Sequence, residues 1–349
     1  MSATLKAQPV LNVLLSHHAL DSYGDAIARG VAEASQDRVQ LNWVTPDSPP
    51  DAQGHYPCDI AFVSRDVTGA STKTQLQPSL LRYYEVLRAS PGLAWIHTHS
   101  SGADRPIFGE LMQRGVRVTT SSGANAQSVA HTAVAAVLAL GRRFPSLVQA
   151  QASKAWRPLL NDPHTHSFVG QQAMVVGLGP IGLQIATYLQ ALGLEVVGVT
   201  RDPARHTANA ALTSVHSFST FAHHLQGVRY LILACPLTET TQGLMDIDRL
   251  RLLPQAAYLI NLARGEVVDQ AALVACLNAG HLSGAFLDVF EVEPLPTSSP
   301  LWDMPNVMVS PHTAGHFSGY AQAVFDIFRH NLNAYVLQQP LRNVVQAST

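Results

Sequence analysis

Short apolar runs, several of them rich in β-branched residues, alternate with helical patterns along the chain. In the first third, the helical patterns lie near residues 22–35, 78–90 and 106–114. The apolar runs of this part cover residues 11–15, 39–44, 59–63, 93–96 and 116–119. Strands that alternate with helices are typical of a parallel sheet with crossover helices. The pattern therefore predicts an α/β domain in the first third.

A second series of apolar runs follows, again with helical patterns between them. It covers residues 173–176, 195–199, 230–234, 258–262, 285–289 and 307–309. Six such strands make one complete doubly wound sheet. The expected fold class is therefore α/β, with two doubly wound parallel-sheet domains.

The expected domain boundary lies near residues 121–123, just before an Ala-rich helical run at 126–142. Residues 319–337 have the pattern of an amphipathic helix that would return to the first domain, so that the chain would cross twice between the domains. We predict two domains, one formed by residues 1–122 plus 318–349 and the other by residues 123–317.

Composition and charge exclude several classes of protein. Of the 349 residues, 47% are hydrophobic and 13% are charged, which is typical of a chain with a large buried core. The formal net charge is -2 and no basic stripe is present, so we expect neither nucleic acid nor a membrane as partner. Three widely spaced cysteines fit neither a disulfide framework nor a zinc site. With no secretory pattern in its first residues, the chain is expected to be cytoplasmic.

One glycine-rich turn points to a cofactor. Gly177-Leu178-Gly179-Pro180-Ile181-Gly182 follows the run 173–176 and opens a helical pattern at 181–192. In this context the first glycine makes the tight turn, the second lets backbone approach a pyrophosphate, and the third lets helix pack closely on strand. The helix N-terminus also attracts an anion. The turn therefore predicts dinucleotide binding; a structural glycine turn is the alternative.

The residues after the next strand bear on which dinucleotide binds. A carboxylate at this strand end would bind the ribose 2′-hydroxyl of NAD, but the position holds Thr200, followed by Arg201 and Arg205. Because Arg binds phosphate through a bidentate fork, the two guanidinium groups favour NADP(H). NAD(H) is the alternative, since Asp202 could accept a hydrogen bond from a ribose hydroxyl and both arginines could be surface charges.

Three ionisable residues lie at or after the carboxyl ends of predicted strands of the second domain. They are Arg264, Glu293 and His312. Ligands of open parallel sheets bind beyond this edge. A fixed cation, a carboxylate and an imidazole suit the reduction of a 2-oxo acid. The alternatives without a function are that Arg264 is a surface charge, that Glu293 is an ordinary loop acid, and that His312 is simply one of sixteen histidines.

Five motifs in order make the chain similar to a known family. It resembles the D-isomer-specific 2-hydroxyacid dehydrogenases, which include glyoxylate/hydroxypyruvate reductases. The motifs are the glycine turn, Pro236-Leu237-Thr238 with Thr241, Asn261-Leu262-Ala263-Arg264-Gly265, Leu287-Asp288-Val289-Phe290 with Glu293-Pro294-Leu295, and Pro311-His312-Thr313-Ala314-Gly315. The resemblance implies a flavodoxin-like substrate domain, a Rossmann domain, and an active-site cleft between them.

The resemblance also implies a role for each site residue. Arg264 would bind the substrate carboxylate and polarise the 2-oxo group. His312 would be the general acid in reduction and the base in oxidation, with Glu293 holding its tautomer and favouring its protonated form. The N–H groups of Ser101 and Gly102 would bind the same carboxylate. Contacts with the cofactor are expected from Gly177, Gly179, Pro180, Ile181, Gly182, Thr200, Arg201, Arg205, Pro236, Thr241, Ala263, Asp288 and His312.

Two other functions on the same fold stay open. One is a dehydrogenase of another donor, such as formate, phosphite or D-3-phosphoglycerate. The other is a non-catalytic, NAD(H)-sensing corepressor-like protein, against which the complete set of Arg264, Glu293 and His312 argues.

Several assignments at the edges of the site stay open too. Arg65 is a candidate for a second polar contact with the substrate. His97 and His99 have no assigned role, and we expect no metal. A homodimer through the helical run 126–142 is expected, with burial of that run inside one chain as the alternative.

Overall fold

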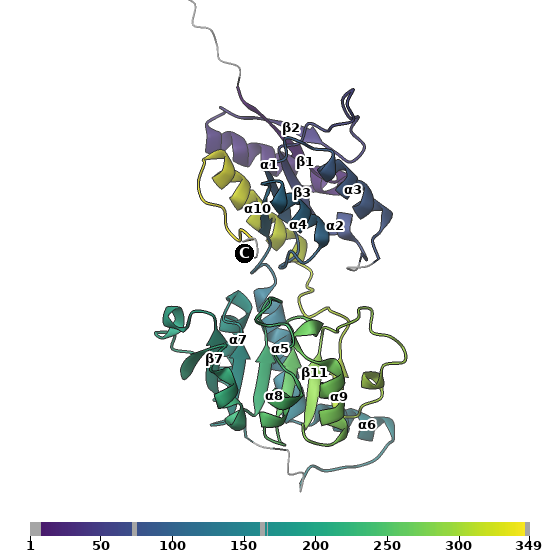
Figure 1. Cartoon of the computed structure of the whole chain (residues 1–349), viewed down its shortest axis with the longest axis vertical. Coiled ribbons are helices and arrows are strands. Elements are labelled where there is room, and N and C mark those ends of the chain that lie inside the picture. The colour runs from purple at the N-terminus through teal and green to yellow at the C-terminus, as the bar shows by residue number, and fades with distance from the viewer. Residues whose placement is uncertain (1–7, 72–74, 161–164, 166, 346–349) are drawn as a thin grey trace, which may run out of the picture. The chain divides into compact units, whose positions relative to one another are not determined.

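The chain forms two compact units. A computed structural model describes residues 8–71, 75–160, 165 and 167–345. One unit contains Met1–Ala124 together with Ser318–Thr349, and the other contains Asn125–Phe317. Each unit has its own parallel sheet with helices on both faces (Figure 1).

The first unit contains a five-stranded sheet in the order β2-β1-β3-β4-β5. Its strands are β1 (Val10–Leu14), β2 (Gln40–Val44), β3 (Ile60–Val63), β4 (Trp95–Thr98) and β5 (Arg117–Thr120). Its helices are α1 (His17–Ser35), α2 (Arg65–Thr68), α3 (Pro78–Arg88), α4 (Pro106–Gln113) and α10 (Tyr320–Val336). This strand order is that of the flavodoxin-like fold, as expected.

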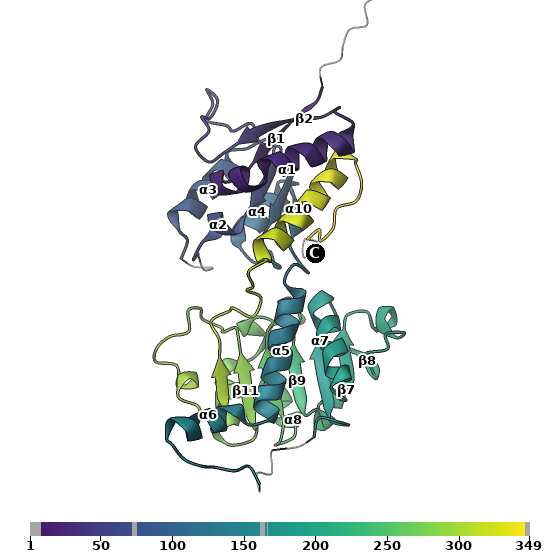
Figure 2. The ribbon, with the colours of Figure 1, turned by 180° about the vertical axis from the view of Figure 1, so that it is seen from behind.

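Two hydrophobic clusters cover the two faces of this sheet. On one face, α1 and α10 lie side by side and bury residues such as Ile27 and Phe328 against Phe62 and Trp95 (Figure 2). On the other face, α3 and α4 bury residues such as Leu80. The C-terminal helix thus completes the core of the unit that contains the N-terminal third of the chain.

The second unit contains a seven-stranded sheet in the order β12-β11-β10-β9-β6-β7-β8. Its strands are β6 (Gln172–Val176), β7 (Glu195–Thr200), β8 (Ser214–Ser217), β9 (Tyr230–Leu233), β10 (Tyr258–Asn261), β11 (Gly284–Leu287) and β12 (Val307–Val309). Its helices are α5 (Ala126–Gly141), α6 (Phe144–Ala152), α7 (Pro180–Ala191), α8 (Ile247–Leu252), α9 (Gln270–Asn278) and the 3₁₀ turns η1 (Pro203–His206), η2 (Phe221–Gly227), η3 (Gly265–Val267) and η4 (Pro300–Trp302).

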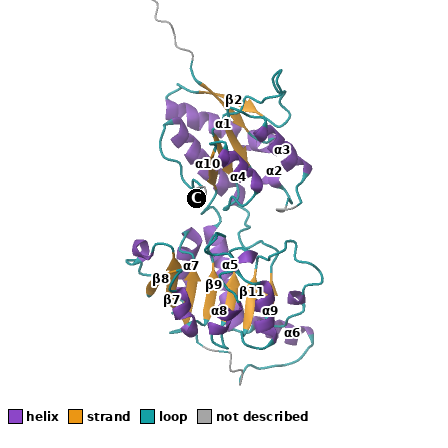
Figure 3. Ribbon diagram, viewed as in Figure 1, coloured by secondary structure: helices purple, strands orange, loops and turns teal. Residues whose placement is uncertain are grey.

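Helices cover both faces of this sheet as well. α5 and α7 pack against one face, and η2, α8 and α9 pack against the other (Figures 2 and 3). Seven residues of α5 are buried, and its main neighbours are α7, β10 and β11 of the same unit. Burial inside one chain therefore accounts for the apolar character of α5.

The prediction of six strands in this unit was wrong, because the sheet has seven. The missed strand is β8, with the sequence Ser-Val-His-Ser, which pairs in parallel with β7 at the edge of the sheet. All four of its residues are only half-buried. A polar edge strand lacks the apolar run by which buried parallel strands are recognised.

Among the described residues, no helix combines the length and apolar character that crossing a bilayer requires.

Candidate active site

The glycine turn lies where the strand order of the second sheet reverses. It follows β6, whose two neighbours are β7 and β9. The Gly177 amide donates to the Val199 carbonyl at 2.8 Å, and the Ala234 amide donates to the Val176 carbonyl at 2.9 Å. Ligands of doubly wound sheets bind at such a switch point, beyond the carboxyl ends of the strands.

A side chain would have a different steric effect at each glycine of the turn. Gly177 has a φ of 98°, in the left-handed region, and a Cβ there would come within 2.6 Å of the Cys235 Cα. A Cβ on Gly182 would overlap the carbonyl oxygen of Gly177 and lie 2.9 Å from its carbon. A Cβ on Gly179 would meet no protein atom within 4 Å. The middle glycine therefore keeps open a space beside the N-terminus of α7, which fits a pyrophosphate.

The residues after β7 are accessible to a ligand. Thr200 is half-buried, and Arg201 is exposed. The side chain of Arg205 is 78% exposed, and its Nε lies 3.8 Å from the Asp202 carboxylate. Such an exposed ion pair is weak, so the Arg205 guanidinium can exchange this partner for a phosphate at little cost.

The loop after β9 contains two further residues from the predicted cofactor set. The Thr241 hydroxyl donates to the Pro236 carbonyl at 2.6 Å and accepts from the Thr238 amide at 2.8 Å. Thr241 is buried, so its side chain acts within the loop and shapes it.

Next to this loop, burial raises the pKa of the Cys235 thiol to about 12, although the Arg264 guanidinium acts in the opposite direction. The Cys235 thiol therefore stays protonated at neutral pH and is no nucleophile.

Arg264 leaves the sheet in a turn that follows β10. The buried Asn261 side chain closes this turn, since its amide donates to the Arg264 carbonyl at 3.0 Å and accepts from the Ala263 amide at 3.1 Å. The Arg264 guanidinium itself donates to the Ala263 carbonyl at 2.7 Å. A Cβ on Gly265 would overlap the Phe290 backbone, so the turn packs directly on the segment after β11.

Glu293 and His312 form a hydrogen-bonded pair. The Nδ1 atom of His312 lies 2.8 Å from Oε2 of Glu293, and the other carboxylate oxygen accepts from the Phe290 amide at 3.1 Å. The side chain of His312 is 49% exposed and that of Glu293 is 32% exposed. With Nδ1 held by the carboxylate, Nε2 is left to face a substrate.

Asp288, at the end of β11, holds the loop that carries His312. Its buried carboxylate accepts from the Ser310 hydroxyl at 2.5 Å, from the Thr313 amide at 2.8 Å and from the Ala314 amide at 3.1 Å. His312 adopts a φ of 51° inside this loop. These contacts show Asp288 as a support of the loop; a contact with the cofactor stays a prediction.

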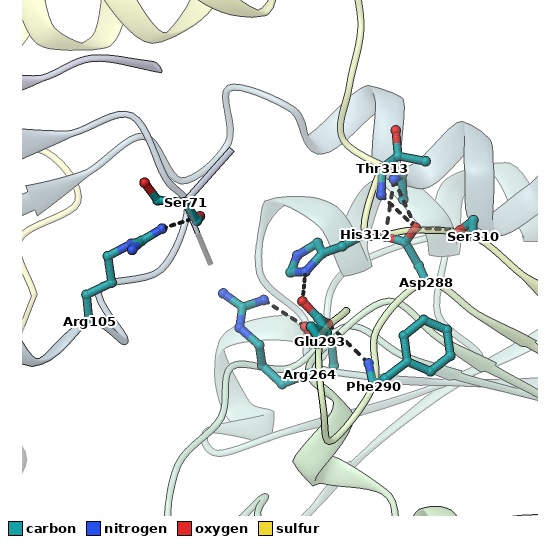
Figure 4. Close-up of polar contacts among 11 residues, drawn as sticks. Ser71, Arg105, Arg264, Asp288, Phe290, Glu293, Ser310, His312 and Thr313 are labelled. Atoms are coloured by element: carbon teal, nitrogen blue, oxygen red, sulfur yellow. Dashed lines mark hydrogen bonds and ion pairs between the residues drawn. The ribbon is translucent and has the colours of Figure 1, made fainter. Parts of the chain in front are cut away.

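These residues gather at one edge of the sheet. Arg264, Glu293 and His312 follow β10, β11 and β12, which are neighbours in the sheet. Figure 4 shows their side chains pointing toward one another. A cation, a carboxylate and an imidazole are thus brought together at the edge where the glycine turn also lies.

The predicted residues Ser101 and Gly102 belong to the first unit. They follow β4, and the Ser100 hydroxyl donates to the Gly102 carbonyl at 2.6 Å, which closes a tight loop. Arg65 begins α2 directly after β3 and is exposed. Residues 72–74, between α2 and α3, lie outside the described residues.

His97 and His99 are both buried in the first unit. The ring of His97 lies between the hydroxyls of Thr119, at 2.8 Å, and Ser121, at 3.0 Å. Burial and the nearby His99 lower the pKa of His97 to about 3, so its ring is neutral. The ring of His99 lies 3.0 Å from the Thr68 hydroxyl. Within the described part of the chain, no group of three or more His, Cys, Asp or Glu is placed to hold a metal ion.

Sequence reasoning missed several residues that build the site. Asn261 begins one recognised motif and Ser310 directly precedes another, but neither was given a role. Ser128 and Thr132 on α5 donate to the carbonyl of Ala314, each at 3.2 Å. An Asn at the end of a strand is a signal that a turn follows. No pattern in the sequence pairs residues 128 and 132 with residue 314, because that contact depends on the packing of α5.

Comparisons with known proteins agree with this geometry. The family model described as D-isomer specific 2-hydroxyacid dehydrogenase, NAD binding domain, matches residues 134–314. A glyoxylate reductase of Thermofilum pendens is 34% identical over 255 residues, which are 72% of this chain and 74% of that protein. A D-3-phosphoglycerate dehydrogenase of Mycobacterium bovis is 31% identical over 288 residues, which are 82% of this chain and 51% of that protein.

A solved structure is similar over nearly the whole chain. It is a D-isomer specific 2-hydroxyacid dehydrogenase of Xanthobacter autotrophicus in complex with NADPH and MES. The sequence identity is 29%, the TM-score is 0.70, and the match covers 96% of this chain and 98% of that one. The chain therefore belongs to the D-isomer-specific 2-hydroxyacid dehydrogenase family, the members of which are oxidoreductases that use a nicotinamide dinucleotide, NAD(P).

Proposed function

We propose that this enzyme reduces a small 2-oxo acid of the glyoxylate or hydroxypyruvate type to the D-2-hydroxy acid, with NADPH as the preferred cofactor. The observation that carries this proposal is the hydrogen-bonded pair of His312 and Glu293 beside Arg264. A proton donor next to a fixed cation is what the reduction of a carbonyl beside a carboxylate needs.

The proposed roles follow from the chemistry of each group. The Arg264 guanidinium binds the substrate carboxylate and stabilises negative charge on the 2-oxo oxygen. Nε2 of His312 donates a proton to that oxygen, while Glu293 holds the ring in place through Nδ1. The N–H groups of Ser101 and Gly102 bind the same carboxylate. NADPH, when bound, supplies the hydride.

A panel of substrates tests the proposal. We expect measurable NADPH oxidation with glyoxylate and hydroxypyruvate, and a clearly lower kcat/KM with 2-oxo acids that have larger side chains. The same panel run with Arg65→Ala tests the exposed guanidinium after β3, which we propose to contact a second polar group of the substrate. An unchanged substrate ranking would remove this role of Arg65. Absence of turnover with every 2-oxo acid would contradict the proposed activity and favour the corepressor-like alternative.

Oxidation of D-3-phosphoglycerate is the second candidate activity. It is favoured by the 31% identity to the mycobacterial D-3-phosphoglycerate dehydrogenase over 82% of this chain. A higher kcat/KM for D-3-phosphoglycerate with NADP or NAD than for glyoxylate with NADPH would favour this candidate.

The preference for NADPH is proposed on the basis of Arg201 and Arg205. The double variant Arg201→Ser/Arg205→Ser is expected to lower kcat/KM for NADPH tenfold or more, because charge-assisted hydrogen bonds contribute about 1.5–3 kcal/mol. The kcat/KM for NADH should change less than about twofold. Initial rates with NADPH and with NADH measure both effects.

Asp202→Asn is the control. It should leave the kcat/KM for NADPH nearly unchanged, since it removes only the weak, exposed ion-pair partner of Arg205. A tenfold preference of the unaltered enzyme for NADH would overturn the proposal.

We also propose a homodimer. Large apolar side chains are exposed on and after α6, next to the end of α5: Phe144 at 53%, Val148 at 59%, Trp156 at 95% and Leu160 at 87%. Several large apolar side chains left exposed in one stretch of a chain favour a protein interface. The variant Val148→Asp/Trp156→Asp should be a monomer by light scattering, whereas Leu81→Asp on α3 should leave the mass unchanged. A monomeric unaltered enzyme at micromolar concentration would refute the dimer.

We further propose that the enzyme is cytoplasmic. The thiols of Cys58, Cys235 and Cys276 are all free and buried, as is usual in a reducing compartment.

A further inference from the structure

In the loop that carries His312, both the backbone amide and the backbone carbonyl of Ala314 are hydrogen-bonded to side chains. Asp288 accepts from the Ala314 amide on one side, at 3.1 Å. On the other side, the hydroxyls of Ser128 and Thr132 both point to the Ala314 carbonyl, each at 3.2 Å, and the Thr132 hydroxyl shares its single proton with the Ser128 carbonyl, also at 3.2 Å. Ala314 is 6% exposed, and the side chains of Ser128 and Thr132 that reach it are half-buried.

The two hydroxyls come from one face of α5, because residues four apart on a helix lie above one another. Ser128 also donates to the His316 carbonyl at 3.4 Å. A Cβ on Gly315 would overlap the side chain of Asn125, which directly precedes α5. The backbone after His312 therefore runs against the first two turns of α5.

This support matters because of the backbone at His312. A φ of 51° is unfavourable for a non-glycine residue, by about 1–2 kcal/mol, and persists only where the surroundings impose it. The direction of the imidazole depends on that backbone, and so does its 2.8 Å contact with Glu293. Figure 4 shows the Asp288 carboxylate next to the backbone of the loop, with the imidazole projecting toward Glu293.

We propose that Ser128 and Thr132 are positioning residues for His312. Together with Asp288 they fix the backbone of Ala314 at its amide and at its carbonyl, and thereby hold the imidazole on Glu293. The consequence for turnover rests on the proposed function, in which His312 is the general acid. The consequence for the imidazole does not.

The test compares the double variant Ser128→Ala/Thr132→Val with a matched control, Thr187→Val. The Thr187 hydroxyl donates to the Leu183 carbonyl four residues earlier in α7, at 2.9 Å, as the Thr132 hydroxyl does to the Ser128 carbonyl in α5, but it makes no bond to the loop. We expect the double variant to lose about tenfold or more in kcat, because small misplacements of a reacting group are costly. The KM for NADPH and the melting temperature should stay close to those of the control.

A second readout needs no turnover. In the enzyme without ligands, the ring signals of His312 are identified in an NMR spectrum by their loss in His312→Asn. The Nδ1 proton bound to Glu293 should give a signal protected from exchange in the unaltered enzyme and in Thr187→Val, and a broadened or absent signal in the double variant. Thr132→Ser, which keeps the hydroxyl, should retain both the signal and kcat.

The outcomes separate this inference from the proposed function. A double variant with unchanged kcat and an unchanged His312 signal would overturn the inference. So would a loss of kcat in Thr132→Ser equal to that of Thr132→Val, since the hydroxyl would then not be the cause. If the signal is lost in the double variant but His312→Asn retains turnover, the positioning stands and the proposed function fails.

Discussion

Replacing His312 by asparagine is expected to lower kcat for glyoxylate reduction about 10³-fold, the middle of the range for loss of a general acid. Asparagine is the informative substitute because it tolerates the left-handed backbone that His312 adopts at a φ of 51°. The loop should therefore keep its bonds to Asp288, and only the proton donor is lost. The KM for NADPH should change less than about threefold. Steady-state rates at saturating NADPH measure the effect.

The matched control is His330→Asn on α10, an exposed histidine in the first unit. It should retain kcat within about twofold and melt at the same temperature as the unaltered enzyme. Glu293→Gln should fall between the two, because an amide oxygen still accepts from Nδ1 but the hydrogen bond is no longer charge-assisted. A His312→Asn variant that keeps more than a tenth of the activity would show that another group donates the proton.

A methyl group on either of two glycines in the β6–α7 turn is expected to have distinct effects. In Gly182→Ala the new Cβ overlaps the Gly177 carbonyl, so α7 must move away from β6. Such overpacking costs about 2 kcal/mol, which corresponds to roughly 4–8 °C in melting temperature for a unit of this size. In Gly179→Ala the new Cβ meets no protein atom within 4 Å, so the fold should keep its stability.

Cofactor binding should respond to both substitutions. The methyl of Gly179→Ala enters the space where the proposed pyrophosphate approaches the N-terminus of α7. Loss or lengthening of one charge-assisted hydrogen bond there corresponds to about 10- to 100-fold in Kd for NADPH. Gly182→Ala should weaken binding at least as much, because it displaces the whole turn. Calorimetric titration with NADPH and thermal unfolding without it separate the two effects.

Gly109→Ala on α4 is the control for the substitution itself. Its Cβ would also meet nothing within 4 Å, and it lies in the first unit. Alanine in a helix interior is favoured over glycine by about 0.5–1 kcal/mol, so stability should be unchanged or higher and NADPH binding unchanged. If Gly179→Ala binds NADPH as tightly as Gly109→Ala does, the turn does not bind the pyrophosphate.

Much of the fold followed from the apolar pattern. Most strands that are buried on both faces, such as β6 and β9, contain continuous apolar runs, and these were predicted. β8 was missed because an edge strand need not be apolar. The apolar pattern does not contain the order of the strands in the sheet. That order was expected only from the fold class that the resemblance implied.

For the site, too, the local motifs could be predicted from the sequence and the contacts between distant segments could not. The turn 177–182 could be recognised from the sequence because its steric demands are local and are met only by glycine at fixed spacings. Arg264 and His312 could be placed at strand ends for the same reason. The bond between Nδ1 of His312 and Glu293 was expected only by resemblance, and the individual bonds of Asp288 to the loop came only from the structure.

The chain alone thus specified which residue types stand at which strand ends, since backbone conformation and side-chain burial act over a few neighbouring residues. Packing in three dimensions decided how those ends are held. Ser128 and Thr132 lie more than 180 residues before Ala314, and only the docking of α5 beside the last loop makes them its hydrogen-bond donors. Contacts between such distant segments depend on the register of whole helices and strands, which no local pattern encodes.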